Sequence, residues 1–210
     1  MRSLLGAEED VQFLSDEIHA GPRYHLHAID LRDLDMDRVS NSSTPRLSQI
    51  SADTATLIIS ECCLTYLKPE AADSVIRYFT KQVLKESTPR GLLLYEPINP
   101  FDAFGKVMVS NLAYRGIVLQ TLQHYGSLEA QISRLNKYGF ESGQGAVDLA
   151  YLQDKWIDEV DKDRISRLEM LDEIEELDML MKHYCIAWAW HDGPNTSIWT
   201  RWRKIQSQPL

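Results

Sequence analysis

Leu57-Ile58-Ile59-Ser60-Glu61-Cys62-Cys63-Leu64-Thr65-Tyr66-Leu67-Lys68-Pro69-Glu70 is the segment that decides the fold of this 210-residue chain. It begins with a short apolar run, which is typical of a strand buried on both faces of a parallel sheet. The run stops at the carboxylate of Glu61, and Lys68-Pro69-Glu70 then opens a helix with proline in its first turn. Open α/β sheets bind ligands at the carboxyl ends of their strands, so the segment predicts a binding site beside Glu61.

Two other segments repeat this arrangement of an apolar run that ends in an acid. A strand from Tyr24 onward would end at Asp30, and the run from Leu92 would end at Glu96. We expect the three acids to face one crevice, where carboxylates suit a ligand that offers amines or hydroxyls and repel free phosphates. Two alternatives stay open: acids that are merely solvated at loop starts, and a glycosidase pair of Glu61 and Glu96.

The order of the remaining elements predicts the fold class. Helical spacing from Glu70 to Glu86 joins two strand-like runs, which makes a βαβ unit with parallel strands. The class is therefore α/β, with a mostly parallel sheet and an antiparallel C-terminal edge. A helix after Asn99-Pro100 should carry an apolar stripe of Phe101, Phe104, Met108 and Leu112, which packs on the core or roofs the crevice. The later expected elements are a helix from Ser127 to Lys137, part of a strand within 140–152, a long helix over Asp161–His183, a hairpin of 185–190 with 198–202, and a frayed end after Lys204.

The amino-acid composition narrows the classes of protein to which the chain could belong. At 44% hydrophobic residues the chain is long enough for one domain with its own core, and its net charge of -9 argues against a nucleic-acid partner. No apolar run approaches the roughly 20 residues of a membrane span. Three cysteines without ligand spacing fit a reducing compartment, and we expect the cytoplasm. His25 and His27 share a strand face but lack a third ligand, so no metal site is expected.

Several motifs in order resemble the leucine carboxyl methyltransferase family, and the likeness runs from about residue 23 to 192. The motifs are His25-Leu26-His27-Ala28-Ile29-Asp30-Leu31-Arg32-Asp33-Leu34, the segment from Ile59 to Glu70, Tyr95-Glu96-Pro97-Ile98-Asn99 with Phe104-Gly105, Ser127-Leu128-Glu129-Ala130-Gln131, and Glu169 to Asp178 followed by Met181-Lys182-His183-Tyr184-Cys185.

The resemblance implies a class I S-adenosylmethionine-dependent methyltransferase fold. The implied reaction is methyl esterification of the C-terminal leucine carboxylate of the protein phosphatase 2A catalytic subunit, with S-adenosyl-L-methionine as the methyl donor. By the resemblance, Asp30 with Leu31 contacts the adenine, Glu61 holds the amino group of the methionine part, and Tyr66 lies near the transfer site as the catalytic residue. The partner would be the phosphatase tail, and we expect a monomer that binds neither nucleic acid nor membrane.

The chain departs from the family pattern at its start, because nothing in Met1 to Pro22 resembles the family's glycine-rich cofactor loop. We therefore expect an N-terminally truncated sheet: a poorly defined segment over 1–22, the C-terminal part of the methyltransferase domain over 23–204, and a tail over 205–210. Two alternatives stay open: an inactive fragment or remnant that still binds the phosphatase, and, more distantly, a tRNA-modifying relative.

Overall fold

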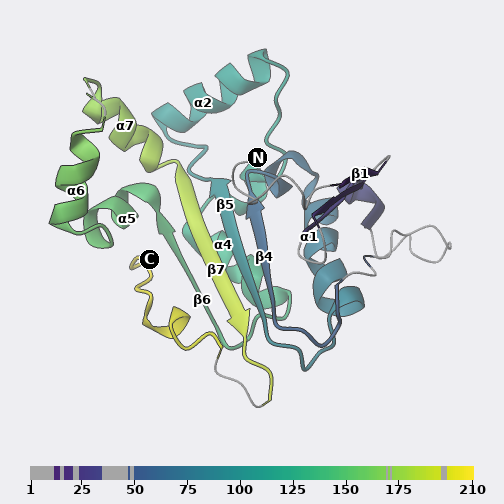
Figure 1. Ribbon diagram of the computed structural model, residues 1–210. Helices are drawn as coiled ribbons and strands as arrows, with labels where there is room; N and C mark the ends of the chain where they lie inside the picture. The colour runs from purple at the N-terminus through teal and green to yellow at the C-terminus, as the bar shows by residue number, and fades with distance from the viewer. Residues whose placement is uncertain are drawn as a thin grey trace.

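A computed structural model shows an α/β architecture, as the sequence predicts: a sheet with helices packed against it (Figure 1). The structure describes residues 12–14, 17–20, 24–34, 47, 50–168, 170, 172–194 and 198–210.

The main sheet has four strands in the order β4-β5-β7-β6, with bounds Thr56–Glu61, Arg90–Pro97, Tyr184–His191 and Gly143–Asp148. β4 pairs with β5 in parallel, and β7 is antiparallel to both β5 and β6. Three strands therefore share one direction and only β7 opposes them, which is the predicted mixture. The antiparallel strand nevertheless lies between β5 and β6, and not at the edge of the sheet.

The predicted βαβ unit is confirmed. α1 (Pro69–Tyr78) continues as the π-helical turn η6 (Phe79–Val83) and connects β4 to β5. Pro69 takes the first helical turn, where a missing N–H costs nothing. One side of this helix packs in the main core with β5 and with α4 (Leu128–Lys137), which begins at the expected N-cap Ser127.

The expectation that β4 is buried on both faces is wrong. Ile58 packs against the main core, but Ile59 on the opposite face is 64% exposed, and Leu57 is exposed as well. β4 is the edge strand of the four-stranded sheet, and the helical cover of this sheet half lies on the face that carries Ile58. An apolar run in the sequence does not show which face of the strand is covered by another element of the fold.

The strand from Tyr24 differs from its prediction too. β3 (Tyr24–His27) pairs antiparallel with β2 (Glu17–Ala20), which pairs with β1 (Gln12–Leu14) in a separate three-stranded sheet. β3 ends three residues before Asp30, whose carboxylate accepts the backbone N–H of Arg32 at 2.9 Å and so favours a turn. The turn is the 3₁₀ helix η4 (Leu31–Leu34).

The helix predicted after Asn99-Pro100 is present, and its apolar stripe is only partly buried. α2 (Ala103–Tyr114) begins at Asp102, whose side chain accepts the N–H of Gly105, and α3 (Leu122–Tyr125) follows it. Phe101, at the start of the predicted core stripe, is 62% exposed. In Figure 1, α2 lies beyond the end of the sheet, and the other stripe residues, Phe104, Met108 and Leu112, are half-buried.

The single long helix expected over 161–183 is wrong. The chain forms α5 (Leu149–Lys155), α6 (Glu159–Ser166) and α7 (Ile174–Met181). Acidic residues crowd the sequence 169–178, and like charges three or four residues apart destabilise a helix. In the described part of the chain, no helix is long and apolar enough to cross a membrane.

The expected hairpin is also wrong, because β7 finds both its partners inside the sheet. Residues 198–201 form a turn that leads into η7 (Trp202–Lys204). Trp199 and Trp202 pack together, with ring centroids 4.8 Å apart, in a tryptophan cluster against Trp190. The segment is thus held by packing of its tryptophan rings on the face of the sheet, and not by pairing as a strand.

The chain end after Lys204 is held by hydrogen bonds and is not frayed. Ser207 Oγ accepts the N–H of Ala146, and Gln208 Oε1 accepts the N–H of Asp148 at 2.9 Å. These bonds satisfy backbone groups on the free edge of β6. The predicted boundaries of the three domain segments stay predictions.

Candidate functional site

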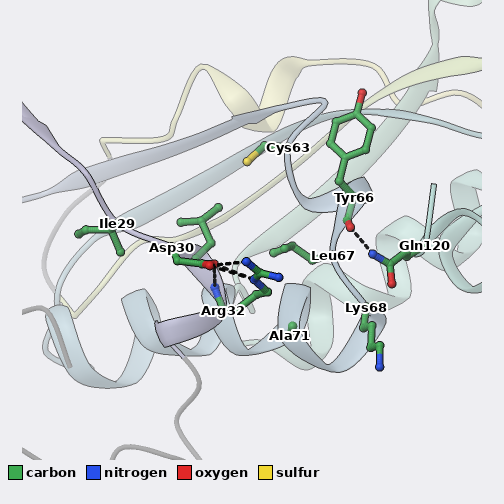
Figure 2. Close-up of a pocket in the computed structure, with 10 residues that line it drawn as sticks. Ile29, Asp30, Arg32, Cys63, Tyr66, Leu67, Lys68, Ala71 and Gln120 are labelled. Carbon is green, nitrogen blue, oxygen red and sulfur yellow. Dashed lines mark hydrogen bonds and ion pairs between the residues drawn. The ribbon is translucent and has the colours of Figure 1, made fainter. Parts of the chain in front are cut away.

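The first candidate site is a cavity of about 760 Å³ beside η4 and the start of α1, which we call the Asp30 cavity (Figure 2). Three of the four site residues named from the sequence line it: Asp30, Leu31 and Tyr66. They come from segments more than thirty residues apart, so the fold itself brings them together. The other lining residues are Ile29, Arg32, Cys63, Leu67, Lys68, Ala71 and Gln120.

Asp30 carries a fixed negative charge in this cavity. The Arg32 side chain donates from Nε to Oδ1 at 2.9 Å and from Nη2 to Oδ2 at 2.5 Å. The hydrogen bonds from this side chain, and then the backbone N–H of Arg32, lower the pKa of Asp30 to about 2. Asp30 is therefore ionised at neutral pH, and a carboxylate has lone pairs left for an amine or hydroxyl of a ligand.

Tyr66 lies on the 3₁₀ turn η5 (Leu64–Tyr66), which the segment after α2 holds in place. Gln120 Nε2 donates to the carbonyl oxygen of Tyr66 at 2.5 Å, and the N–H of Thr121 donates to that of Thr65 at 3.3 Å. The Tyr66 ring points away from the Gln120 contact (Figure 2). Gln120 could not be predicted from the sequence, because a glutamine in a loop 54 residues away carries no recognisable signal.

The structure does not bring Glu61 into the Asp30 cavity. Its side chain is exposed at the carboxyl end of β4, beside its register partner Tyr95. The next residue, Cys62, has a left-handed backbone with φ 42° and donates its N–H to the Tyr95 carbonyl at 2.8 Å. Burial, and then the charges of Glu96 and Glu61, raise the pKa of the Cys62 thiol, so the thiol stays protonated.

The predicted crevice of three acids is wrong, because Glu96 is buried inside the core. Only 1% of Glu96 is exposed, and Arg134 Nη1 reaches its Oε2 at 3.5 Å. Burial raises the pKa of Glu96 against the opposing effect of Arg134. β5 is an inner strand, and alternate side chains on it, including that of Glu96, face the helices. Glu96 therefore cannot contact a ligand at the sheet edge or form a glycosidase pair with Glu61.

A second cavity, of about 450 Å³, lies at the same end of the sheet. Its lining is uncharged and consists of Cys62, Tyr95, Leu149, Leu177, Leu180, Met181 and Tyr184. Across the described ranges, no group of three or more His, Cys, Asp or Glu residues could hold a metal ion.

Comparison with known proteins identifies relatives over most of the chain. Leucine carboxyl methyltransferase 1 of Aspergillus fumigatus is 45% identical over 97% of this chain and 56% of its own length. The proteins of the same name from Emericella nidulans and Yarrowia lipolytica are 46% and 42% identical, over 92% and 90% of this chain and 52% and 54% of their lengths. No family model matches the chain.

Among solved structures, similar chains include two of phosphoethanolamine N-methyltransferase 2 from Haemonchus contortus. Their TM-scores are 0.37 and 0.33, at 11% and 14% identity, over 66% and 63% of this chain and 33% and 32% of theirs. This likeness is too weak to bear on function. The sequence relatives are far more similar, at 42% to 46% identity, and they carry the name of the family that the sequence motifs resemble. By sequence, the chain is similar to leucine carboxyl methyltransferases over nearly its whole length, and it spans about half the length of the curated relatives that it matches.

Proposed function

We propose that the chain takes part in S-adenosyl-L-methionine-dependent methyl esterification of the C-terminal leucine carboxylate of the protein phosphatase 2A catalytic subunit. The observation that carries this proposal is the 45% identity to a leucine carboxyl methyltransferase 1, which extends over 97% of the chain. The phosphatase tail is then the partner, and the cytoplasm is the proposed location.

The residues of the Asp30 cavity fit part of this methyl donor. The cavity lies within the roughly 300–1,000 Å³ range of small-molecule sites. Ionised Asp30 suits an amine or hydroxyl of a nucleoside, and Ile29 and Leu31 offer apolar surface for a flat ring. In this proposal Asp30 and Leu31 hold the adenosine part. Glu61, at the end of β4, holds the amino group of the methionine part.

The reaction requires no catalytic base from the chain. A leucine carboxylate is ionised at neutral pH, so no proton has to leave before it attacks. When bound, the sulfonium of the cofactor supplies an electrophilic methyl group. The task of the chain's own residues is to hold and align the two reactants, and such alignment contributes a large share of catalysis in two-substrate reactions. Tyr66, which lines the Asp30 cavity, is the residue that we assign to this alignment.

The test is a methyl-transfer assay with the purified chain, the phosphatase catalytic subunit and S-adenosyl-L-methionine with a tritiated methyl group. We expect base-labile tritium on the phosphatase, and none on a phosphatase that lacks its last leucine. Calorimetric titration with S-adenosyl-L-methionine measures the cofactor site separately. A folded chain that binds the phosphatase without cofactor binding or methyl transfer would contradict the proposal and favour the inactive binding remnant.

Substitution of Glu61 tests its assignment in the same titration. Glu61→Gln removes the charge and keeps the shape, and loss of a charged partner should weaken cofactor binding by more than about tenfold. Glu70→Gln, an exposed acid in the first turn of α1, is the matched control and should leave binding unchanged. Equal affinities of both variants would remove Glu61 from the site.

A further inference from the structure

The uncharged cavity, which we call the Tyr95 cavity, has walls from four elements. Tyr95 of β5 and Tyr184 of β7 stack with centroids 5.5 Å apart and planes at 16°. α7 adds Leu177, Leu180 and Met181, and the first residue of α5, Leu149, completes the apolar lining with Cys62. Apolar walls with two aromatic rings form a site for an aliphatic group.

The two cavities lie on either side of one turn. Cys62 lines the Tyr95 cavity, and the next residue, Cys63, lines the Asp30 cavity. The left-handed backbone at Cys62 is the point at which the chain leaves β4. The turn after it carries Tyr66, which lines the Asp30 cavity. The two cavities are therefore separated at this point by a single turn of the chain.

The two linings differ in charge, and this decides which ligand each can take. The Asp30 cavity includes Asp30, Arg32 and Lys68, whereas none of the described residues that line the Tyr95 cavity is charged. Burial raises the pKa of both Tyr95 and Tyr184, which keeps the two phenols neutral. An ammonium or carboxylate group would lose hydration in the Tyr95 cavity without gaining a partner, and an aliphatic side chain would gain from burial.

We propose that the Tyr95 cavity binds the aliphatic side chain of the carboxyl-terminal residue and selects leucine at that position. The proposal rests on the proposed function, since it places the substrate residue beside the methyl donor. It goes beyond that function by assigning the selectivity to Tyr95, Tyr184 and the inner side of α7. Hydrophobic pockets discriminate about 10- to 200-fold per methylene group at best, so the expected selectivity against a terminal alanine is at least about tenfold.

Peptide binding tests the proposal without depending on catalysis. Short peptides with identical sequences that end in leucine or alanine carry an N-terminal fluorophore, and anisotropy gives their Kd for the full chain. We expect the leucine peptide to bind at least about tenfold more tightly. Equal affinities, or no binding of either peptide, would overturn the proposal.

Variants of α7 locate the selectivity. Leu180 lines the Tyr95 cavity and is 42% exposed, so Leu180→Trp can fill the cavity without burying a new ring in the core. Met179 is 41% exposed, lies next to it on the helix and lines a different cavity, which makes Met179→Trp the matched control. Leu180→Trp should abolish the preference for leucine and Met179→Trp should keep it. The reverse result would overturn the proposal.

A second variant covers the case in which Leu180→Trp fails to fold, as circular dichroism would show. Leu180→Ala enlarges the cavity, and it should improve binding of a peptide that ends in phenylalanine relative to leucine by several-fold. An unchanged ranking of the two peptides would count against the cavity. If the wild-type chain selects leucine but transfers no methyl group, the cavity assignment stands and the proposed function fails.

Discussion

Arg134 and Asp73 join α4 to α1 inside the core through a hydrogen-bonded ion pair. Arg134 Nε donates to Asp73 Oδ1 at 3.0 Å, and the two side chains are 0% and 10% exposed. Tyr125 and Tyr138 also donate their hydroxyls to the other carboxylate oxygen, at 2.5 and 2.7 Å. The guanidinium of Arg134 also contacts Glu96, so it lies between the two buried carboxylates of Asp73 and Glu96.

Arg134→Met is therefore expected to lower the free energy of unfolding by about 3–5 kcal/mol, because it leaves buried carboxylates without their cation. Urea denaturation followed by tryptophan fluorescence measures this change. Arg167→Met breaks an exposed pair with Asp163 and should cost less than about 1 kcal/mol. Similar losses for the two variants would show that the buried cluster does not support the core.

Glu96 should make stability depend on pH in the direction opposite to that of an ordinary paired carboxylate. Burial raises its native pKa above the usual 4.5, so the native state binds the proton more tightly than the unfolded state. Stability then falls as pH rises from the unfolded pKa through the native one. Glu96→Gln removes this dependence, and its stability relative to wild type should rise with pH across that window.

Urea denaturation of wild type and Glu96→Gln at about pH 4.5 and about pH 7.5 measures the difference, and each unit of pKa elevation corresponds to about 1.4 kcal/mol. Glu129→Gln, an exposed acid on α4, should give no such trend. A stability difference that is constant with pH would mean that the native pKa of Glu96 is not raised.

Signals carried by neighbouring residues were sufficient to predict much of the fold. Pro69 and Ser127 start helices where expected, because N1 proline and an N-cap serine act on the backbone next to them. The βαβ unit followed from two apolar runs and the helix between them, and its parallel pairing is confirmed. The sites were predicted less completely: Asp30, Leu31 and Tyr66 share a cavity, but Glu61 does not line it.

The errors arose where a distant neighbour decides the outcome. Glu61 and Glu96 look alike in sequence, but β4 is an edge strand and β5 an inner one, so the first acid is exposed and the second is buried. The segment 198–202 has the pattern of a strand, but β7 already has two partners and Trp199 packs on the sheet face. Gln120 and the Tyr95 cavity depend on contacts between remote segments, which no local pattern encodes.

Gln120 should affect the Asp30 cavity through the turn that it holds. Gln120→Ala removes the hydrogen bond to the Tyr66 carbonyl, and the loss of one such bond should raise the Kd for S-adenosyl-L-methionine by roughly three- to tenfold. A shift of the Tyr66 carbonyl ¹³C resonance reports the lost bond whether or not the cofactor binds. Gln123→Ala, an exposed glutamine in the neighbouring helix α3, is the control. An unshifted Tyr66 resonance in Gln120→Ala would refute the contact.

The docking of the chain end on β6 can be tested by amide exchange. The N–H of Asp148 donates to Gln208 Oε1, and Gln208 Nε2 donates back to Asp148 Oδ2 at 3.0 Å. Gln208→Ala removes both bonds. The bond that protects the Asp148 amide contributes about 1 kcal/mol, so its loss should accelerate hydrogen exchange at Asp148 by roughly fivefold to tenfold. Gln206→Ala, two residues earlier and exposed, should leave this rate unchanged. Equal exchange rates at Asp148 in wild type and Gln208→Ala would show that β6 presents a free edge in solution, open to pairing with another strand.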